Sequence, residues 1–198
     1  RARYYRSVQS AGGANEDAIR DEILAVTGVT AVTVYSNTTA AQDSDGLPPH
    51  SIECVVSGGQ DLAVGQAIHR RKAAGIATHG STTVSVVDAS GVTRAIRFSR
   101  PTAVTVWVQI TGLSVVSGYT AAGVQAAIRA ALAAYITGLG VGVPVMYMRV
   151  IPVISGVPGV ADYTAKIGTD GSTWDTGNIS ITSRQVAATD SDKVVYAT

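Results

Sequence analysis

The sequence predicts an α+β protein with two small lobes, each a mainly antiparallel sheet with helices packed on one face. Helical and strand-like spacings of apolar residues alternate in short blocks along the 198 residues, as they do in small mixed folds. Short connections at positions 89–91 and 171–177 suit hairpins between antiparallel strands. Arg100-Pro101 separates two sets of blocks, so we expect one domain over residues 1–100 and a second over residues 101–198.

In the first domain, Asn15 is expected to cap a helix, because Glu16 and Asp17 follow it and favour the positive end of the helix dipole. The alternation of apolar residues predicts strands, and glycines mark where helices end. The further elements expected in this domain are strands at 29–35 and 51–57, a helix at 60–74, and a hairpin of residues 82–88 with 92–98.

In the second domain, an Ala-rich segment with an apolar stripe predicts a long helix over residues 121–137. A further helix is expected over residues 145–155, interrupted near Pro152, because proline lacks a backbone N–H group. The strands expected here are residues 103–110, 160–167 and 178–183, with room for one more after Val186.

The two halves share a short pattern at a constant offset, which would place a helix, a glycine and a strand in each domain. The matching residues are Ile19, Ile23, Val26, Gly28 and Val29 in the first half and Val150, Ile154, Val157, Gly159 and Val160 in the second. Either a duplicated module or two independent glycine helix stops would produce this pattern.

Composition excludes several classes of function. Charged residues make up 15% of the chain and the net charge is +1, so the basic stripe that nucleic-acid binding needs is absent from the sequence. Cys54 is the single cysteine and lies in an alternating strand, which predicts a buried thiol and excludes an intrachain disulfide. The longest weakly polar stretch is broken by glycines and a proline, so we expect no membrane span.

The start at Arg1, with no apolar core behind it, is typical of an interior segment of a longer protein.

Motifs that carry chemistry are also missing from the sequence. His50, His69 and His79 have no spacing typical of a metal site, and no GxSxG motif occurs. Asp43 and the acidic residue two positions on lack the spacing of a calcium loop and instead favour a turn. The glycines at 138–142 follow a helix rather than precede one, which is the wrong side for a phosphate. We therefore predict no catalytic residue, cofactor or metal.

Two segments are candidate interface sites. Trp174 lies in a Gly/Thr loop, where it either packs on its own domain or is presented to a partner. Tyr4, Tyr5 and Arg6 belong to residue types that are enriched in interfaces. Because the chain has low charge and no heptad repeat, we expect it to be a monomer or weak oligomer in isolation.

The segment from Val34 to Val56, with Gly46, Leu47, Pro48, Pro49 and His50 at its centre, resembles the baseplate J-like family of contractile-tailed bacteriophages. Further segments that resemble this family are residues 17–19, 26–29, 67–80, 92–101, 134–142 and 157–160. The resemblance implies a structural wedge subunit of a phage or prophage baseplate, without catalytic residues. Its partners would be other copies and other tail proteins, in the virion after assembly in the host cytoplasm.

In the same family, Gly46 to His50 form a structural signature loop. We expect Pro48 and Pro49 to hold the chain extended before the strand at Ser51. The alternatives are a carbohydrate- or receptor-binding module, which would align exposed aromatic residues on one groove, and a hydrolase, which would need convergent carboxylates in a cleft.

Overall fold

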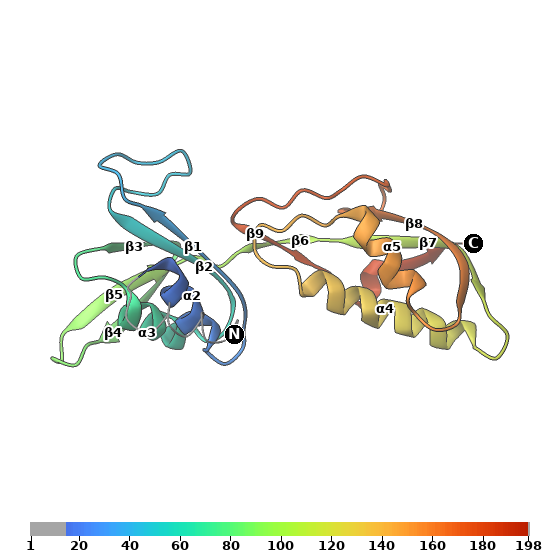
Figure 1. Cartoon of the computed structure of the whole chain (residues 1–198), viewed down its shortest axis with the longest axis horizontal. Helices are drawn as coiled ribbons and strands as arrows, with labels where there is room; N and C mark the ends of the chain where they lie inside the picture. The colour runs from blue at the N-terminus through green and yellow to red at the C-terminus, as the bar shows by residue number, and fades with distance from the viewer. Residues whose placement is uncertain (1–14, 198) are drawn as a thin grey trace, which may run out of the picture. The chain divides into compact units, whose positions relative to one another are not determined.

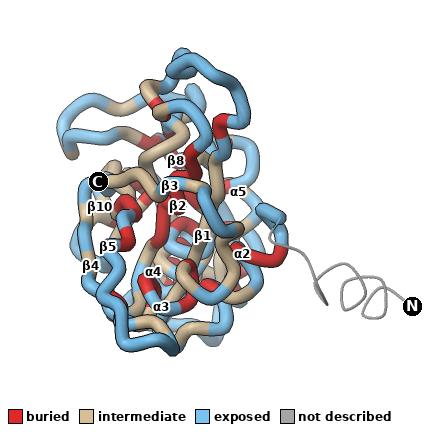
Figure 2. The backbone as a smooth tube through the Cα atoms, turned by 90° about the vertical axis from the view of Figure 1, so that its left-hand side faces the viewer, coloured by how far each residue is buried: buried red, intermediate tan, exposed pale blue. Residues whose placement is uncertain are grey.

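The computed structural model describes residues 15–197 and divides the chain into two compact units, Arg1–Pro101 and Thr102–Thr198. Each unit combines helices with small sheets (Figure 1), which confirms the predicted α+β class. The longest strand ladders are antiparallel, while three short pairings are parallel: β2 (Ser51–Gly58) with β3 (Ala77–His79), β6 (Thr102–Thr105) with β9 (Gln185–Ala188), and β7 (Trp107–Val115) with β10 (Val194–Ala197). Buried residues follow the strands and helices, whereas the connections are largely exposed (Figure 2).

The first unit begins with the helix predicted from its cap, since the Asn15 side chain accepts a hydrogen bond from the Ala18 N–H at 2.8 Å. Its β1 and β2 pair antiparallel, β3 joins β2 in parallel, and β4 with β5 form the predicted hairpin. Its elements are α2 (Glu16–Leu24), β1 (Val29–Asn37), β2 (Ser51–Gly58), α3 (Asp61–Arg71), β3 (Ala77–His79), β4 (Thr82–Val87) and β5 (Thr93–Phe98).

The core of the first unit forms where α2 and α3 cover one face of its strands. Alternate residues of β2, Ile52, Cys54 and Val56, point to the same face because side chains alternate along a strand. They pack with Ile19 and Ile23 of α2, which lie one helical turn apart. The α3 and hairpin residues of this core are Val64, Ala67, Ile68, Val86, Ile96 and Phe98.

The second unit has the strand order β10-β7-β8, with β6 paired to β9 in a separate two-stranded sheet. The helix predicted over residues 121–137 is present with those bounds, and Thr120 caps it by accepting from the Gly123 N–H. Its elements are β6 (Thr102–Thr105), β7 (Trp107–Val115), α4 (Ala121–Thr137), α5 (Tyr147–Ser155), β8 (Val160–Gly168), β9 (Gln185–Ala188), a 3₁₀ turn (Ser191–Lys193) and β10 (Val194–Ala197).

The two helices of the second unit share one face of its sheet. Val108 lies opposite Ile167 and Ile110 opposite Ala165, so these side chains project from the same face. Against them pack the α4 stripe, whose members recur every four residues, and two residues of α5. These helix residues are Val124, Ile128, Leu132, Ile136, Val150 and Ile154, all nearly inaccessible to solvent.

Three predicted elements of the second domain are wrong. The strand expected over residues 103–110 is divided at Val106, where pairing passes from the β6–β9 sheet to the β7–β8 sheet. Helix α5 runs through Pro152 without interruption, and this proline, inside the helix, lies on its exposed side, where water can bond the backbone carbonyl that the missing N–H leaves free. Residues 178–183 do not form a strand, and their pairing is an isolated bridge of Ile179 with Val145. In place of the hairpin expected across 171–177, there is an isolated bridge of Ile167 with Asp175.

The shared pattern of the two halves corresponds to similar local structure. In each unit a helix ends, a glycine with positive φ follows, and a strand begins, at Gly28 (φ 85°) and at Gly159 (φ 94°). The helix residues of the pattern are buried in their respective cores. Both units therefore share the order helix, glycine, strand at this point of the chain.

Candidate functional site

The connection between β1 and β2, residues 38–50 and here called the β1–β2 loop, is organised by Asn37. This side chain is 4% exposed, and its amide donates to the carbonyl oxygens of Ala41 at 2.8 Å and Leu47 at 2.9 Å. Its amide oxygen accepts from the N–H and the hydroxyl of Thr39. One buried amide group therefore forms hydrogen bonds with both arms of the loop, and these bonds also satisfy the buried amide itself.

Asp43 forms the turn that was predicted in place of a calcium loop. Its carboxylate accepts from the backbone N–H groups of Asp45 at 3.0 Å and Leu47 at 2.8 Å. The Leu47 side chain behind this turn is 1% exposed. The loop is thus built around one buried leucine and internal hydrogen bonds.

The prediction that Pro48 and Pro49 hold the chain extended up to β2 is wrong. Residues 49 and 50 form a turn, and His50 has φ 50°, in the left-handed region. The Ser51 hydroxyl donates to the Pro48 carbonyl at 2.6 Å and closes this turn. The chain therefore reverses immediately before β2, and His50 is exposed.

The segment Phe98-Ser99-Arg100-Pro101 lies beside β2. Backbone hydrogen bonds run from the Ser99 N–H to Cys54 O and from the Val56 N–H to Ser99 O, both at 2.9 Å. The Ser99 hydroxyl donates to the carboxylate of Glu53 at 2.6 Å. Both side chains are buried, so the hydroxyl satisfies one of the carboxylate's hydrogen bonds within the protein.

Arg100 clamps the turn between β2 and α3. Its guanidinium donates to the carbonyl oxygens of Val56 at 3.0 Å, Gly58, and Gly59 at 2.8 Å. It also pairs with Asp61 at 2.5 Å, at the N-terminus of α3. A planar fork with several fixed donors suits this task, which a lysine could not perform.

Cys54, His69 and His79 lie on separate elements of the first unit. Burial raises the pKa of the Cys54 thiol to about 12, which is typical of an inert structural cysteine and confirms that it is buried. His69 and His79 are half-buried, on α3 and β3 respectively. Among the residues that the structure describes, no group of three or more His, Cys, Asp or Glu side chains could hold a metal ion.

Trp174 is half-buried, and it packs near Gly168 at the end of β8. Its loop is shaped by Asp170, which accepts from the Ser172 N–H at 2.8 Å and the Thr173 N–H at 2.7 Å. These backbone hydrogen bonds hold the pKa of Asp170 well below its usual range. The other predicted interface residues, Tyr4, Tyr5 and Arg6, lie outside the described residues.

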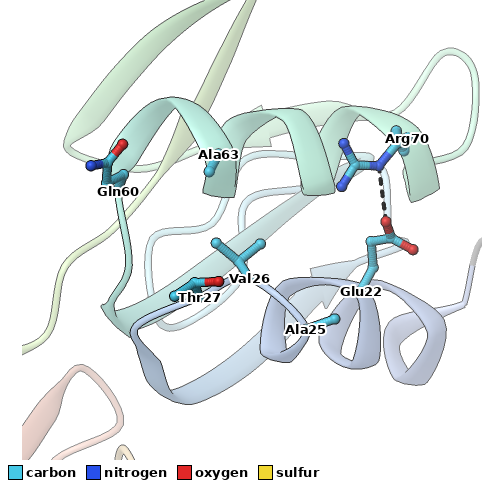
Figure 3. Close-up of a pocket in the computed structure, with 7 residues that line it drawn as sticks. All are labelled: Glu22, Ala25, Val26, Thr27, Gln60, Ala63 and Arg70. Atoms are coloured by element: carbon cyan, nitrogen blue, oxygen red, sulfur yellow. Dashed lines mark hydrogen bonds and ion pairs between the residues drawn. The ribbon is translucent and has the colours of Figure 1, made fainter.

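A groove of about 400 Å³ lies between α2 and α3 in the first unit (Figure 3). Glu22 of α2 crosses it to pair with Arg70 at 2.9 Å and with Arg71 at 2.8 Å. The hydrogen bond from Arg71, and to a smaller extent the one from Arg70, lowers the pKa of Glu22. The groove lining is completed by Ala25, Val26, Thr27, Gln60 and Ala63.

Four pockets of the described residues, including the groove of Figure 3, lack the features that the alternative functions would need. Each of the four contains at most one carboxylate, Glu16, Glu22 or Asp88. Tyr119 is the one aromatic residue in their linings. None of the described helices is sufficiently long and apolar to cross a membrane.

The sequence did not indicate the organising contacts of Asn37 and Arg100, although Arg100 lies in the segment 92–101, which carries part of the family resemblance. Asn37 is a polar residue at the end of an alternating strand, and this position alone is a weak signal for a residue that organises a loop. The partners of Arg100 lie about 40 positions away, so spacing along the chain carries no signal for them.

Two comparisons relate this geometry to known proteins. The chain is similar to a chain in the cryo-EM structure of the anti-feeding prophage (AFP) baseplate, six-fold symmetrised, with a TM-score of 0.51 and 12% identity. The likeness covers 89% of this chain and 37% of the solved one, so the present sequence spans little more than a third of that length. No curated protein matches.

The second comparison concerns the second unit, whose core and sheet are described above. Residues 106–191 match the family described as Baseplate J-like protein C-terminal domain. The match begins at the division between β6 and β7 and ends in the 3₁₀ turn before β10. Over residues 106–191 the second unit is therefore similar to a baseplate J-like protein C-terminal domain.

Proposed function

We propose that this protein is a structural wedge subunit of a contractile-tail baseplate, which joins neighbouring copies of itself and other tail proteins. The observation that carries the proposal is the family match over residues 106–191. The likeness of 89% of the chain to a baseplate component extends support to the first unit at the level of fold. In this role the protein resides in the virion, after assembly in the host cytoplasm, and performs no catalysis.

The internal hydrogen-bond networks support a rigid structural role rather than a reactive centre. Asn37, Glu53 and Arg100 each form hydrogen bonds that connect segments of the first unit. Such groups make a fold rigid and specific, as a subunit that must fit its neighbours requires. Trp174, half-buried at a loop, is retained as a candidate interface anchor.

A carbohydrate- or receptor-binding module is the alternative proposal. It would place several exposed aromatic residues along one groove. In the pockets described above, Tyr119 stands alone at 52% exposure. This distribution favours the structural proposal.

The experiment is a deletion in the tailed particle that carries this protein. Particles made without residues 106–191 should have tails that lack complete baseplates in negative-stain electron micrographs, while the wild-type gene supplied in trans restores them. Complete baseplates on particles made without residues 106–191 would overturn the proposal.

A further inference from the structure

Another groove of the first unit, here called the α2–β2 groove, has a volume of about 330 Å³. It lies where the start of α2 meets the end of β1, the start of β2 and the segment that follows α3. Its lining is largely apolar: Ile19 and Ile52 reach it from the core, and Ile76 is partly buried beside them. Pockets for small ligands begin at about 300 Å³, so the groove has room for an apolar or aromatic group.

Glu16 is the one carboxylate among the described residues that line this groove. It is exposed, and it accepts a hydrogen bond from the Ser36 hydroxyl. No described lysine or arginine forms an ion pair with it; Lys72, beside the groove, donates to the Ile76 carbonyl at 3.0 Å instead. An apolar groove with a carboxylate at its rim suits an occupant that combines an aromatic ring with a cation.

Residues 1–14 have this combination of side chains. Tyr4 and Tyr5 stand between Arg3 and Arg6, and the 14 residues contain three arginines and no acidic residue. Residues 15–101, by contrast, contain nine Asp and Glu against seven Lys and Arg. The segment and the unit that bears the groove are therefore opposite in charge, which favours their association.

The segment also ends at the groove, because Asn15 alone separates residues 1–14 from Glu16. Gly12 and Gly13 come shortly before this point, and glycine adopts the backbone conformations that a chain reversal needs. The six residues between Tyr5 and Gly12 can span up to about 20 Å, which is enough for a return to the groove. A group tethered this closely has a high effective concentration, which favours it over the same segment of another copy.

We propose that residues 1–14 bind the α2–β2 groove of their own chain, with a tyrosine ring on its isoleucines and a neighbouring arginine beside Glu16. The proposal goes beyond the baseplate role and does not rest on it. Tyr4, Tyr5 and Arg6 are also candidate residues for contacts with other tail proteins. A partner that uses them must therefore first displace the segment from the groove.

Methyl NMR of the purified chain tests the occupant. An aromatic ring that packs on a methyl group shifts the resonance of that group. The double variant Tyr4→Ala and Tyr5→Ala should therefore change the methyl resonances that line the groove, namely those of Ile19, Ile52 and Ile76. Unchanged resonances of these three isoleucines would overturn the proposal.

Two controls accompany this measurement. The double variant Tyr4→Phe and Tyr5→Phe keeps both rings, so the groove resonances should stay close to those of the wild type. Ile128 and Ile154 lie in the core of the second unit, and their resonances should be the same in all three proteins.

Trypsin digestion tests the contact with Glu16. Binding in the groove protects the bond after Arg6, because cleavage follows the population of the undocked segment. Glu16→Gln removes the rim charge and should speed this cleavage by roughly two- to fivefold, the effect of one exposed ion pair. Asp21→Asn is the matched control, since Asp21 is an exposed acid of the same helix that is absent from the groove lining. Equal rates for the two variants would contradict the contact.

Dilution of the protein distinguishes the chain's own segment from that of a second copy. Binding within one chain gives a cleavage rate that is unchanged when the protein is diluted tenfold at constant trypsin concentration. Protection that disappears on dilution would assign the groove to a second copy and overturn the proposal. All these measurements use the purified chain, so their failure is separate from a failure of the baseplate role, which is read from particles.

Discussion

The Ser99 hydroxyl lies 2.6 Å from the carboxylate of Glu53, 46 positions earlier in the chain, and both residues are buried. This contact joins the last segment of the first unit to the middle strand of its sheet. It lies beside two backbone hydrogen bonds between Ser99 and β2. The first unit is thus closed by its own C-terminal segment.

Replacing Ser99 by alanine should destabilise the first unit by about 1–3 kcal/mol, because a buried carboxylate loses a donor that water cannot replace. Urea unfolding of the variant measures this loss. Ser81→Ala, at an exposed serine of the same unit, is the control and should change stability by less than about 0.5 kcal/mol. Equal effects of the two variants would contradict a structural role for this contact.

Asn37→Ala should cost about 2–3 kcal/mol, because it leaves the buried carbonyl of Leu47 and the Thr39 groups without their partner. Hydrogen exchange should quicken throughout residues 38–50 in this variant, since the amide connects both arms of the loop. Thr38→Ala, an exposed neighbour, is the control. Unchanged exchange in the loop would show that Asn37 does not organise it.

The double variant Pro48→Ala and Pro49→Ala should lower the unfolding free energy by about 1–2 kcal/mol, since each proline restricts the unfolded chain. The effect should appear in thermal unfolding and in assembly with other tail proteins. If the double variant instead removed a measurable catalytic activity, the structural interpretation of the β1–β2 loop would be wrong.

Glu22 should make the stability of the first unit depend on pH in the acid range. Its pKa in the folded protein is lowered from 4.5 by Arg71 and Arg70, so its contribution is complete above the unfolded pKa and is lost as pH falls through the folded one. Glu22→Gln should therefore be less stable than the wild type at pH 7, and the difference should shrink below about pH 4.5.

A double-mutant cycle with Arg71→Gln isolates this pair. The coupling free energy measured by urea unfolding should decline over the same acid range. A coupling that is constant from pH 7 to pH 3 would contradict the assignment to the Glu22 carboxylate.

Local signals predicted much of the fold. The Asn15 cap and the stripe of α4 are short-range patterns, and both helices begin where these patterns place them. Val106 and Pro152 were misjudged because their outcome depends on tertiary context, namely a change of strand partner and an exposed helix face.

The organising residues of the first unit could be predicted less well. Asp43 was recognised as a turn residue because its partners follow within four positions. The partners of Arg100, by contrast, lie on β2 and the turn after it, and only the folded chain brings them together. The left-handed conformation of His50 likewise follows from the closure of its turn and not from its residue type.

Cryo-EM of the intact tailed particle that carries this protein tests the baseplate role most directly. Both units, with the β1–β2 loop and the α4–α5 layer as landmarks, should fit density in repeated copies around the tail axis at the baseplate. Particles with a complete, fully interpreted baseplate in which no density fits either unit would contradict the account.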